Sequence, residues 1–118
     1  MSLTADAVTA LVALLHLGFL VLEMFLWDKP FGRRTFRLSV EQAASTKVLA
    51  ANQGLYNGFL SAGLVWGLVM GAEGFGVKAF FLVCVIVAGV FGAATVSRRI
   101  LWIQAMPAAI ALGLMLAA

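Results

Sequence analysis

The sequence predicts an all-α fold in which a bundle of four transmembrane helices makes a polytopic integral membrane protein. The chain has 118 residues, of which 64% are hydrophobic and 11% are charged, whereas soluble domains are about half apolar and about a quarter charged. A soluble fold of this size has too little interior to bury so much apolar surface, so the surplus must face lipid. The apolar residues also gather in four runs, each near the ~20 residues that cross a bilayer.

The four runs define the predicted spans. They cover residues 7–27, 48–70, 78–96 and 100–118, and together they make a single membrane domain over residues 1–118. Backbone polar groups in lipid must be bonded within the segment, and the runs lack the alternating pattern of barrel strands, so we expect each span to be a helix. Residues 28–47 are the one segment of soluble character, and we expect them to form a cytoplasmic loop.

The basic residues predict the orientation. Five of the 8 Lys and Arg residues lie between the first two spans and two lie between the last two. Positive residues are retained on the cytoplasmic side, so we expect both loops in the cytoplasm and both termini outside, in a multi-pass protein of the inner membrane. The excess of positive charge is therefore explained by the membrane topology, and we expect no nucleic-acid partner. The loop cations are Lys29, Arg33, Arg34, Arg37 and Lys47, then Arg98 and Arg99.

Small residues recur every four positions in two of the spans. Helices in lipid associate where small side chains let their backbones approach closely, so we expect the second span to contact neighbours on two sides. The same faces are candidates for contacts between copies in a homo-oligomer. The rows are Gly54-xxx-Gly58-xxx-Ala62, Gly63-xxx-Gly67-xxx-Gly71 and Ala105-xxx-Ala109-xxx-Gly113-xxx-Ala117.

Polar side chains inside the spans are the candidate site, because each is costly in hydrocarbon and faces a bundle interior or a wet cavity. In the first span, His16 and Glu23 are seven residues apart, on one helix face and roughly 10 Å from each other. Counted from the cytoplasmic ends of their spans, Glu23, Asn52 and Gln104 lie at the same depth and predict one polar layer. The residues expected to bind a ligand or handle protons are His16, Glu23, Asn52, Gln53, Tyr56, Asn57 and Gln104.

Glu23 is the strongest of these candidates, because an intramembrane carboxyl group can exchange protons or bind a cation. For the amides and Tyr56, hydrogen bonds that merely join helices are an equally good interpretation. A metal centre is not expected, since one histidine and one cysteine supply too few ligands. No cofactor is expected either. The chain lacks a Walker loop, a Gly-x-Ser-x-Gly elbow, a His-Glu-x-x-His motif and a Cys-x-x-Cys motif, so nucleotide hydrolysis, serine esterase, zincin and thioredoxin-like dithiol activities have no support.

Two segments carry a resemblance to a known family. They are residues 16–27, His-Leu-Gly-Phe-Leu-Val-Leu-Glu-Met-Phe-Leu-Trp, and residues 52–60, Asn-Gln-Gly-Leu-Tyr-Asn-Gly-Phe-Leu. The chain resembles the small bacterial membrane proteins of the DUF1304 family over essentially its whole length. The resemblance implies a compact four-span protein whose hallmark is the polar groups of the first two spans. It implies no substrate, since that family has no established activity.

The favoured function is binding or transport of a small lipophilic or cationic molecule through the polar layer centred on Glu23. One alternative is an intramembrane enzyme that modifies a lipid and uses His16 and Glu23 as acid and base. Another is a purely structural or accessory bundle. The sequence favours a non-enzymatic role, because only two candidate groups are present and they lie far apart. The expected partners are the lipid bilayer, a small lipophilic ligand and a second copy of the chain.

Overall fold

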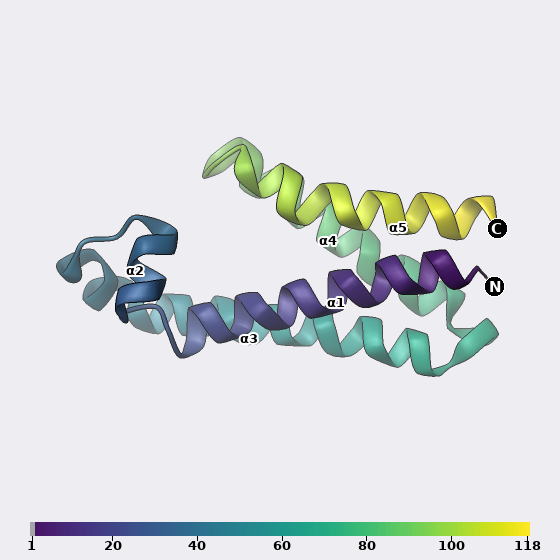
Figure 1. Cartoon of the computed structure of the whole chain (residues 1–118), viewed down its shortest axis with the longest axis horizontal. Helices are drawn as coiled ribbons and strands as arrows, with labels where there is room; N and C mark the ends of the chain where they lie inside the picture. Colours follow the sequence, from purple (N-terminus) through teal and green to yellow (C-terminus); the bar gives the residue numbers. More distant parts are fainter. Residues whose placement is uncertain (1) are drawn as a thin grey trace. The chain divides into compact units, whose positions relative to one another are not determined.

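The computed structural model describes residues 2–118, and every regular element within them is helical (Figure 1). This confirms the all-α class. The chain divides into two compact units, of which unit 1 holds the chain up to Leu14 together with Leu60–Ala118, and unit 2 holds Leu15–Phe59. The elements are α1 (Leu3–Met24), α2 (Pro30–Phe36), α3 (Val40–Val69), the 3-10 helix η1 (Gly71–Gly74), α4 (Phe75–Thr95), the π-helical turn η2 (Leu101–Ala105) and α5 (Met106–Ala117).

Two stretches within residues 2–118 are long and apolar enough to cross a membrane, Leu3–Met24 and Gly71–Thr95. A shorter apolar stretch covers Leu101–Ala117. The helix α3 has 30 residues but is not one of these stretches, because the polar segment 52–57 lowers the hydropathy of its central part. The structure thus contains two helices with the length and composition of a membrane span, and the second and fourth predicted spans stay predictions.

The segment predicted as a loop, residues 28–47, is largely helical. It contains α2, which begins at Pro30 and ends where Arg37 adopts a left-handed conformation with φ 56° and ψ 49°. It also contains the first turns of α3, which begins eight residues before the predicted span. The Ser39 N–H donates to Gln42 Oε1 at 2.9 Å, and the Gln42 N–H donates to Ser39 Oγ at 3.0 Å. This reciprocal capping box satisfies backbone donors at the helix start and explains why α3 begins so early.

In unit 2, the first row of small residues brings α3 against α1. A Cβ atom added at Gly54 would lie 2.6 Å from Met24 Cγ, and one added at Gly58 would lie 2.6 Å from Leu20 Cδ1. No side chain fits at those separations without displacing its neighbour, so glycine sets the distance between the two helices. The structure confirms this contact face at Gly54 and Gly58, whereas Ala62, the third member of the row, is exposed.

In unit 1, the second row of small residues brings the other end of α3 against α4. Gly63 lies against the ring of Phe81, and a Cβ atom at Gly67 would lie 3.0 Å from the backbone nitrogen of Lys78. The prediction that the second span contacts neighbours on two sides is therefore confirmed. The core of this unit gathers residues from four helices: Ala5, Val12, Ala13, Leu64, Leu82, Val85, Ala108, Ala111 and Met115.

Within the chain, the contact row of the fourth predicted span holds at its first member, in η2, and fails at the three members in α5. Ala105 packs on Gly89 of α4, but Ala109, Gly113 and Ala117 are exposed. Each step of four residues advances the side chain about 40° beyond a full helical turn, so the row drifts away from the contact face. The buried residues that replace it are Ala108, Ala111 and Met115.

The two glycines Gly89 and Gly113 should respond to alanine in opposite directions. A Cβ atom at Gly89 would lie 2.7 Å from the backbone nitrogen of Ala105, whereas one at Gly113 meets nothing within 4 Å. We expect Gly89→Ala to destabilise the fold by about 1–3 kcal/mol through overpacking. We expect Gly113→Ala to stabilise it by up to about 1 kcal/mol, because alanine is the better helix former. Equilibrium unfolding in detergent measures both, and two changes of the same sign would contradict the assigned contact face.

Candidate functional site

Glu23 of α1 and Asn57 of α3 are joined by a hydrogen bond in unit 2. The Asn57 side-chain amide donates to Glu23 Oε1, and both side chains are half-buried. Gly54 permits this approach, because a Cβ atom there would lie 3.1 Å from Glu23 Cβ and 3.2 Å from the Leu20 carbonyl oxygen. Neither ion pair found within residues 2–118 includes Glu23. The carboxyl group is thus held by a neutral donor, and no cationic side chain forms a salt bridge with it.

The other polar residues of the second predicted span do not contact Glu23 in this way. Asn52, Gln53 and Tyr56 are exposed. Asn52 and Tyr56 lie two residues on either side of Gly54, which places them about 160° around the helix from the face that packs on α1. The partner of Glu23 is therefore Asn57, three residues after Gly54, while Asn52 points away from α1.

His16 and Gln104 occupy different surroundings. His16 is fully buried and its ring meets that of Phe19 edge to face, with the centroids 5.1 Å apart. Gln104 is half-buried in the π-helical turn. That turn ends two residues before Pro107, which has no N–H to donate to the carbonyl oxygen four residues earlier. The predicted layer that would join Gln104 to Glu23 and Asn52 stays a prediction.

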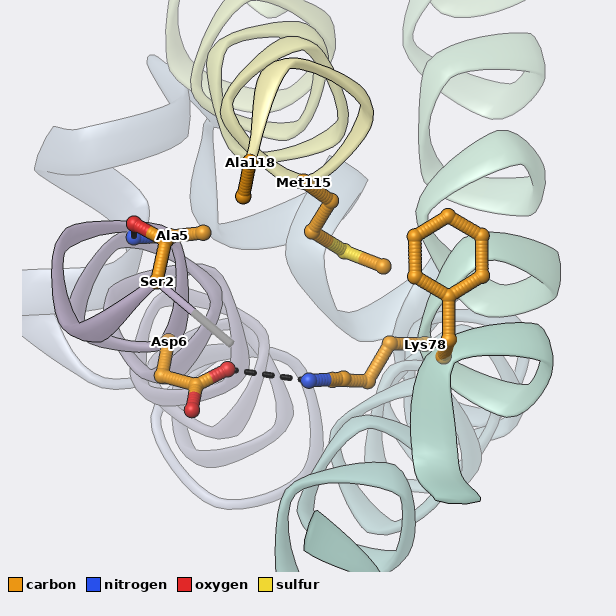
Figure 2. Close-up of a pocket in the computed structure, with 7 residues that line it drawn as sticks. Ser2, Ala5, Asp6, Lys78, Met115 and Ala118 are labelled. Atoms are coloured by element: carbon orange, nitrogen blue, oxygen red, sulfur yellow. Dashed lines mark hydrogen bonds and ion pairs between the residues drawn. The ribbon is translucent and has the colours of Figure 1, made fainter. Parts of the chain in front are cut away.

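Unit 1 holds a charged pair that the sequence reasoning missed. Lys78 Nζ donates to Asp6 Oδ1 at 2.9 Å, and the lysine side chain is 1% exposed while the aspartate side chain is 32% exposed (Figure 2). The lysine stem lies over Gly67, where a Cβ atom would come within 2.5 Å of Lys78 Cγ. The pair ties the first turn of α1 to the first turns of α4.

A small cavity of about 120 Å³ adjoins this pair, and its walls are mainly apolar. Figure 2 shows Asp6 and Lys78 joined on one side of it, with Ala5 and Met115 among the residues around it. A sequence signal for the pair did exist. Asp6 precedes the first predicted span and Lys78 opens the third, so a topology of four alternating spans would place both at the same membrane boundary. The lining residues are Ser2, Ala5, Asp6, Phe75, Lys78, Met115 and Ala118.

The sequence matches a known family over most of its length. The family described as "Protein of unknown function (DUF1304)" matches residues 10–116. The chain belongs to the DUF1304 family. Both segments that carried the resemblance in the sequence, residues 16–27 and 52–60, lie inside the matched range.

A relative of this DUF1304 protein is described as "Uncharacterized protein YpaA" from Lactococcus lactis subsp. lactis (strain IL1403). The two chains are 26% identical over 114 residues, which cover 95% of this chain and 96% of the relative. No solved structure matches the chain. Membership of DUF1304 thus assigns no activity, and the chemistry of the site is what indicates a function.

Proposed function

We propose that this protein spans the membrane four times and binds a lipophilic organic cation at Glu23. The observation that carries the proposal is the Glu23 carboxyl group, which lies in an apolar helix and has the Asn57 amide as its hydrogen-bond donor. An ionisable side chain within a span is costly and marks a functional site by default. A bound cation would offset that cost by supplying the missing opposite charge.

The chemistry of the site favours an organic cation over a metal ion. A cation such as Ca²⁺ takes 6–8 oxygen ligands, whereas this site offers the Glu23 carboxylate and the amide oxygen of Asn57. The surrounding groups are apolar, since Gly54 and Gly58 pack on Leu20 and Met24. A weakly hydrated organic cation loses little hydration on entering such a site and needs one opposite charge.

The alternative of an intramembrane enzyme receives less support. His16, the proposed second catalytic group, is fully buried. A general acid or base must reach the proton that it transfers, and a fully buried imidazole offers no surface to a lipid substrate. The binding function therefore remains the better interpretation of Glu23.

The four-span topology rests on helix length and charge. At ~1.5 Å per residue, α3 is about 45 Å long, enough to cross the ~30 Å hydrocarbon layer despite its polar segment. The stretch Leu101–Ala117 is apolar and shorter, so it would cross with little tilt. With seven of eight cations in two loops, both loops are expected in the cytoplasm.

Cysteine labelling in intact cells tests that topology. With Cys84 replaced by alanine, we expect Glu73→Cys to react with an impermeant thiol reagent added outside. Ser45→Cys should react only after the membrane is permeabilised. Both positions are exposed, so a difference between them reports the side of the membrane. Labelling of Ser45→Cys in intact cells would overturn the proposed orientation.

Equilibrium binding of tetraphenylphosphonium to the purified protein in detergent tests the binding function. This probe is a lipophilic cation with no hydrogen-bond donor, so it needs the negative charge of Glu23 and apolar contact. Saturable binding with one site per chain supports the proposal. Binding that grows linearly with probe concentration, as partition into the micelle would, contradicts it.

A further inference from the structure

The short helix α2 packs closely against the rest of unit 2. Gly32 lies directly against the Leu26 carbonyl group, where no Cβ atom would fit. Phe36 at its other end lies against Trp27, with ring centroids 4.8 Å apart. Trp27 is itself fixed, since its indole Nε1–H donates to Thr46 Oγ1 of α3 at 3.0 Å. These contacts hold α2 in one orientation relative to the end of α1 and the start of α3 (Figure 1).

The acidic residue nearest to α2 is already paired. Lys47 Nζ lies 3.0 Å from Asp28 Oδ2, and this hydrogen bond to Lys47 is the main cause that holds the pKa of Asp28 below its ordinary value. Arg33 Nε donates to the Asp28 carbonyl oxygen at 3.4 Å. The carboxylate of Asp28 therefore balances Lys47 and also attracts Lys29, while neither ion pair within the described residues includes Arg34 or Arg37.

The outer face of α2 is basic and aromatic. Arg34 follows Gly32 by two residues, which places it about 160° around the helix from the packed face. Lys29, Arg34 and Arg37 are exposed, and Phe31 is 54% exposed beside them. We call these four residues the α2 surface. Glu41 is the one other carboxylate between residues 28 and 47.

We propose that the α2 surface is a binding site for the phosphate of an anionic phospholipid headgroup. Resting on the membrane topology of the proposed function, this places the site at the cytoplasmic boundary, because α1 ends at Met24 and α2 begins at Pro30. Arginine and lysine near a membrane attract anionic headgroups, and arginine can bind a phosphate through two parallel hydrogen bonds. Phe31 suits the same boundary, because helices that lie in the membrane interface insert phenylalanine and other apolar side chains between headgroups and chains. An exposed aromatic ring among cations favours a lipid over a fully polar acidic partner.

Calorimetric titration of the detergent-purified protein with short-chain phosphatidylglycerol tests the site, with short-chain phosphatidylcholine as the comparison lipid. We expect phosphatidylglycerol to bind more tightly. The double variant Arg34→Gln/Arg37→Gln should weaken that binding by about fivefold for each arginine removed. Glutamine keeps an unbranched polar side chain, so the packing of α2 is preserved.

The matched control is Arg98→Gln/Arg99→Gln, which removes the same charge from the other basic loop, where both arginines are also exposed. We expect this variant to bind phosphatidylglycerol like the wild type. Equal weakening in both double variants, or equal affinity for the two lipids, would overturn the proposal. Tighter binding of polyglutamate than of phosphatidylglycerol would also overturn it and assign the surface to an acidic protein.

The titration separates this proposal from the proposed function. The Arg34→Gln/Arg37→Gln variant should still bind tetraphenylphosphonium, because Glu23 is unchanged. If the wild type prefers phosphatidylglycerol but fails to bind the phosphonium, the proposed cation site is contradicted and the proposed lipid site is still supported.

Discussion

Replacing Glu23 with glutamine should abolish most of the binding of tetraphenylphosphonium while leaving the fold intact. Glutamine has nearly the same shape and keeps a side-chain oxygen that accepts the hydrogen bond from Asn57. It carries no charge, so the cation loses the one anionic group of the site. We expect an affinity at least about 30-fold lower, equivalent to ~2 kcal/mol, which is the low end for removing one partner of a buried charge pair.

The control for this substitution is Glu73→Gln. Glu73 is exposed in η1, so the variant changes the net charge equally and should bind the phosphonium like the wild type. A second readout is pH. Because protonation of Glu23 competes with cation binding, the wild type should bind less phosphonium as the pH falls, and Glu23→Gln should show little dependence. A flat wild-type profile, or a Glu23→Gln variant that unfolds, would leave the Glu23–Asn57 pair as a purely structural contact.

Much of the fold follows from patterns that act locally. Apolar runs predict helices. The spacing of Gly54, Gly58, Gly63 and Gly67 predicts the two contact faces of α3, because a glycine permits close approach whichever helix packs against it. The early start of α3 could also have been predicted from Ser39 and its partner Gln42. The packed face of α5 could not have been predicted in this way, because its row of small residues does not determine which side of the helix faces α4.

Of the candidate site, the sequence predicts Glu23 but not the residue that bonds to it. Glu23 is recognisable because a carboxyl group in an apolar run is unusual whatever surrounds it. Its partner depends on the rotation of α3 about its own axis, which turns Asn57 toward α1 and Asn52 away. The sequence places Asp6 and Lys78 near the starts of two predicted spans, but their contact follows only from the tertiary fold, because the two residues are 72 positions apart.

The pair of Asp6 and Lys78 should show strongly unequal effects on stability. Asp6→Ala leaves the Lys78 ammonium group buried without its acceptor, and we expect a loss of about 3–5 kcal/mol in the free energy of unfolding. Lys78→Met removes the buried charge and leaves Asp6, whose side chain is 32% exposed and can be hydrated in place. The lysine variant should therefore lose much less stability than the aspartate variant.

The double variant Asp6→Ala/Lys78→Met completes the cycle and isolates the interaction between the two side chains. We expect it to be close to the wild type, because an apolar pair of similar volume replaces a buried ion pair at little cost. Asp28→Ala is the surface control: it breaks the pair with Lys47, whose side chain is 55% exposed, and should change stability little. Unfolding in detergent measures all four variants. If Asp6→Ala proved as mild as Asp28→Ala, the Lys78 ammonium group would have to reach water or another acceptor, and the buried pair would not be what joins α1 to α4.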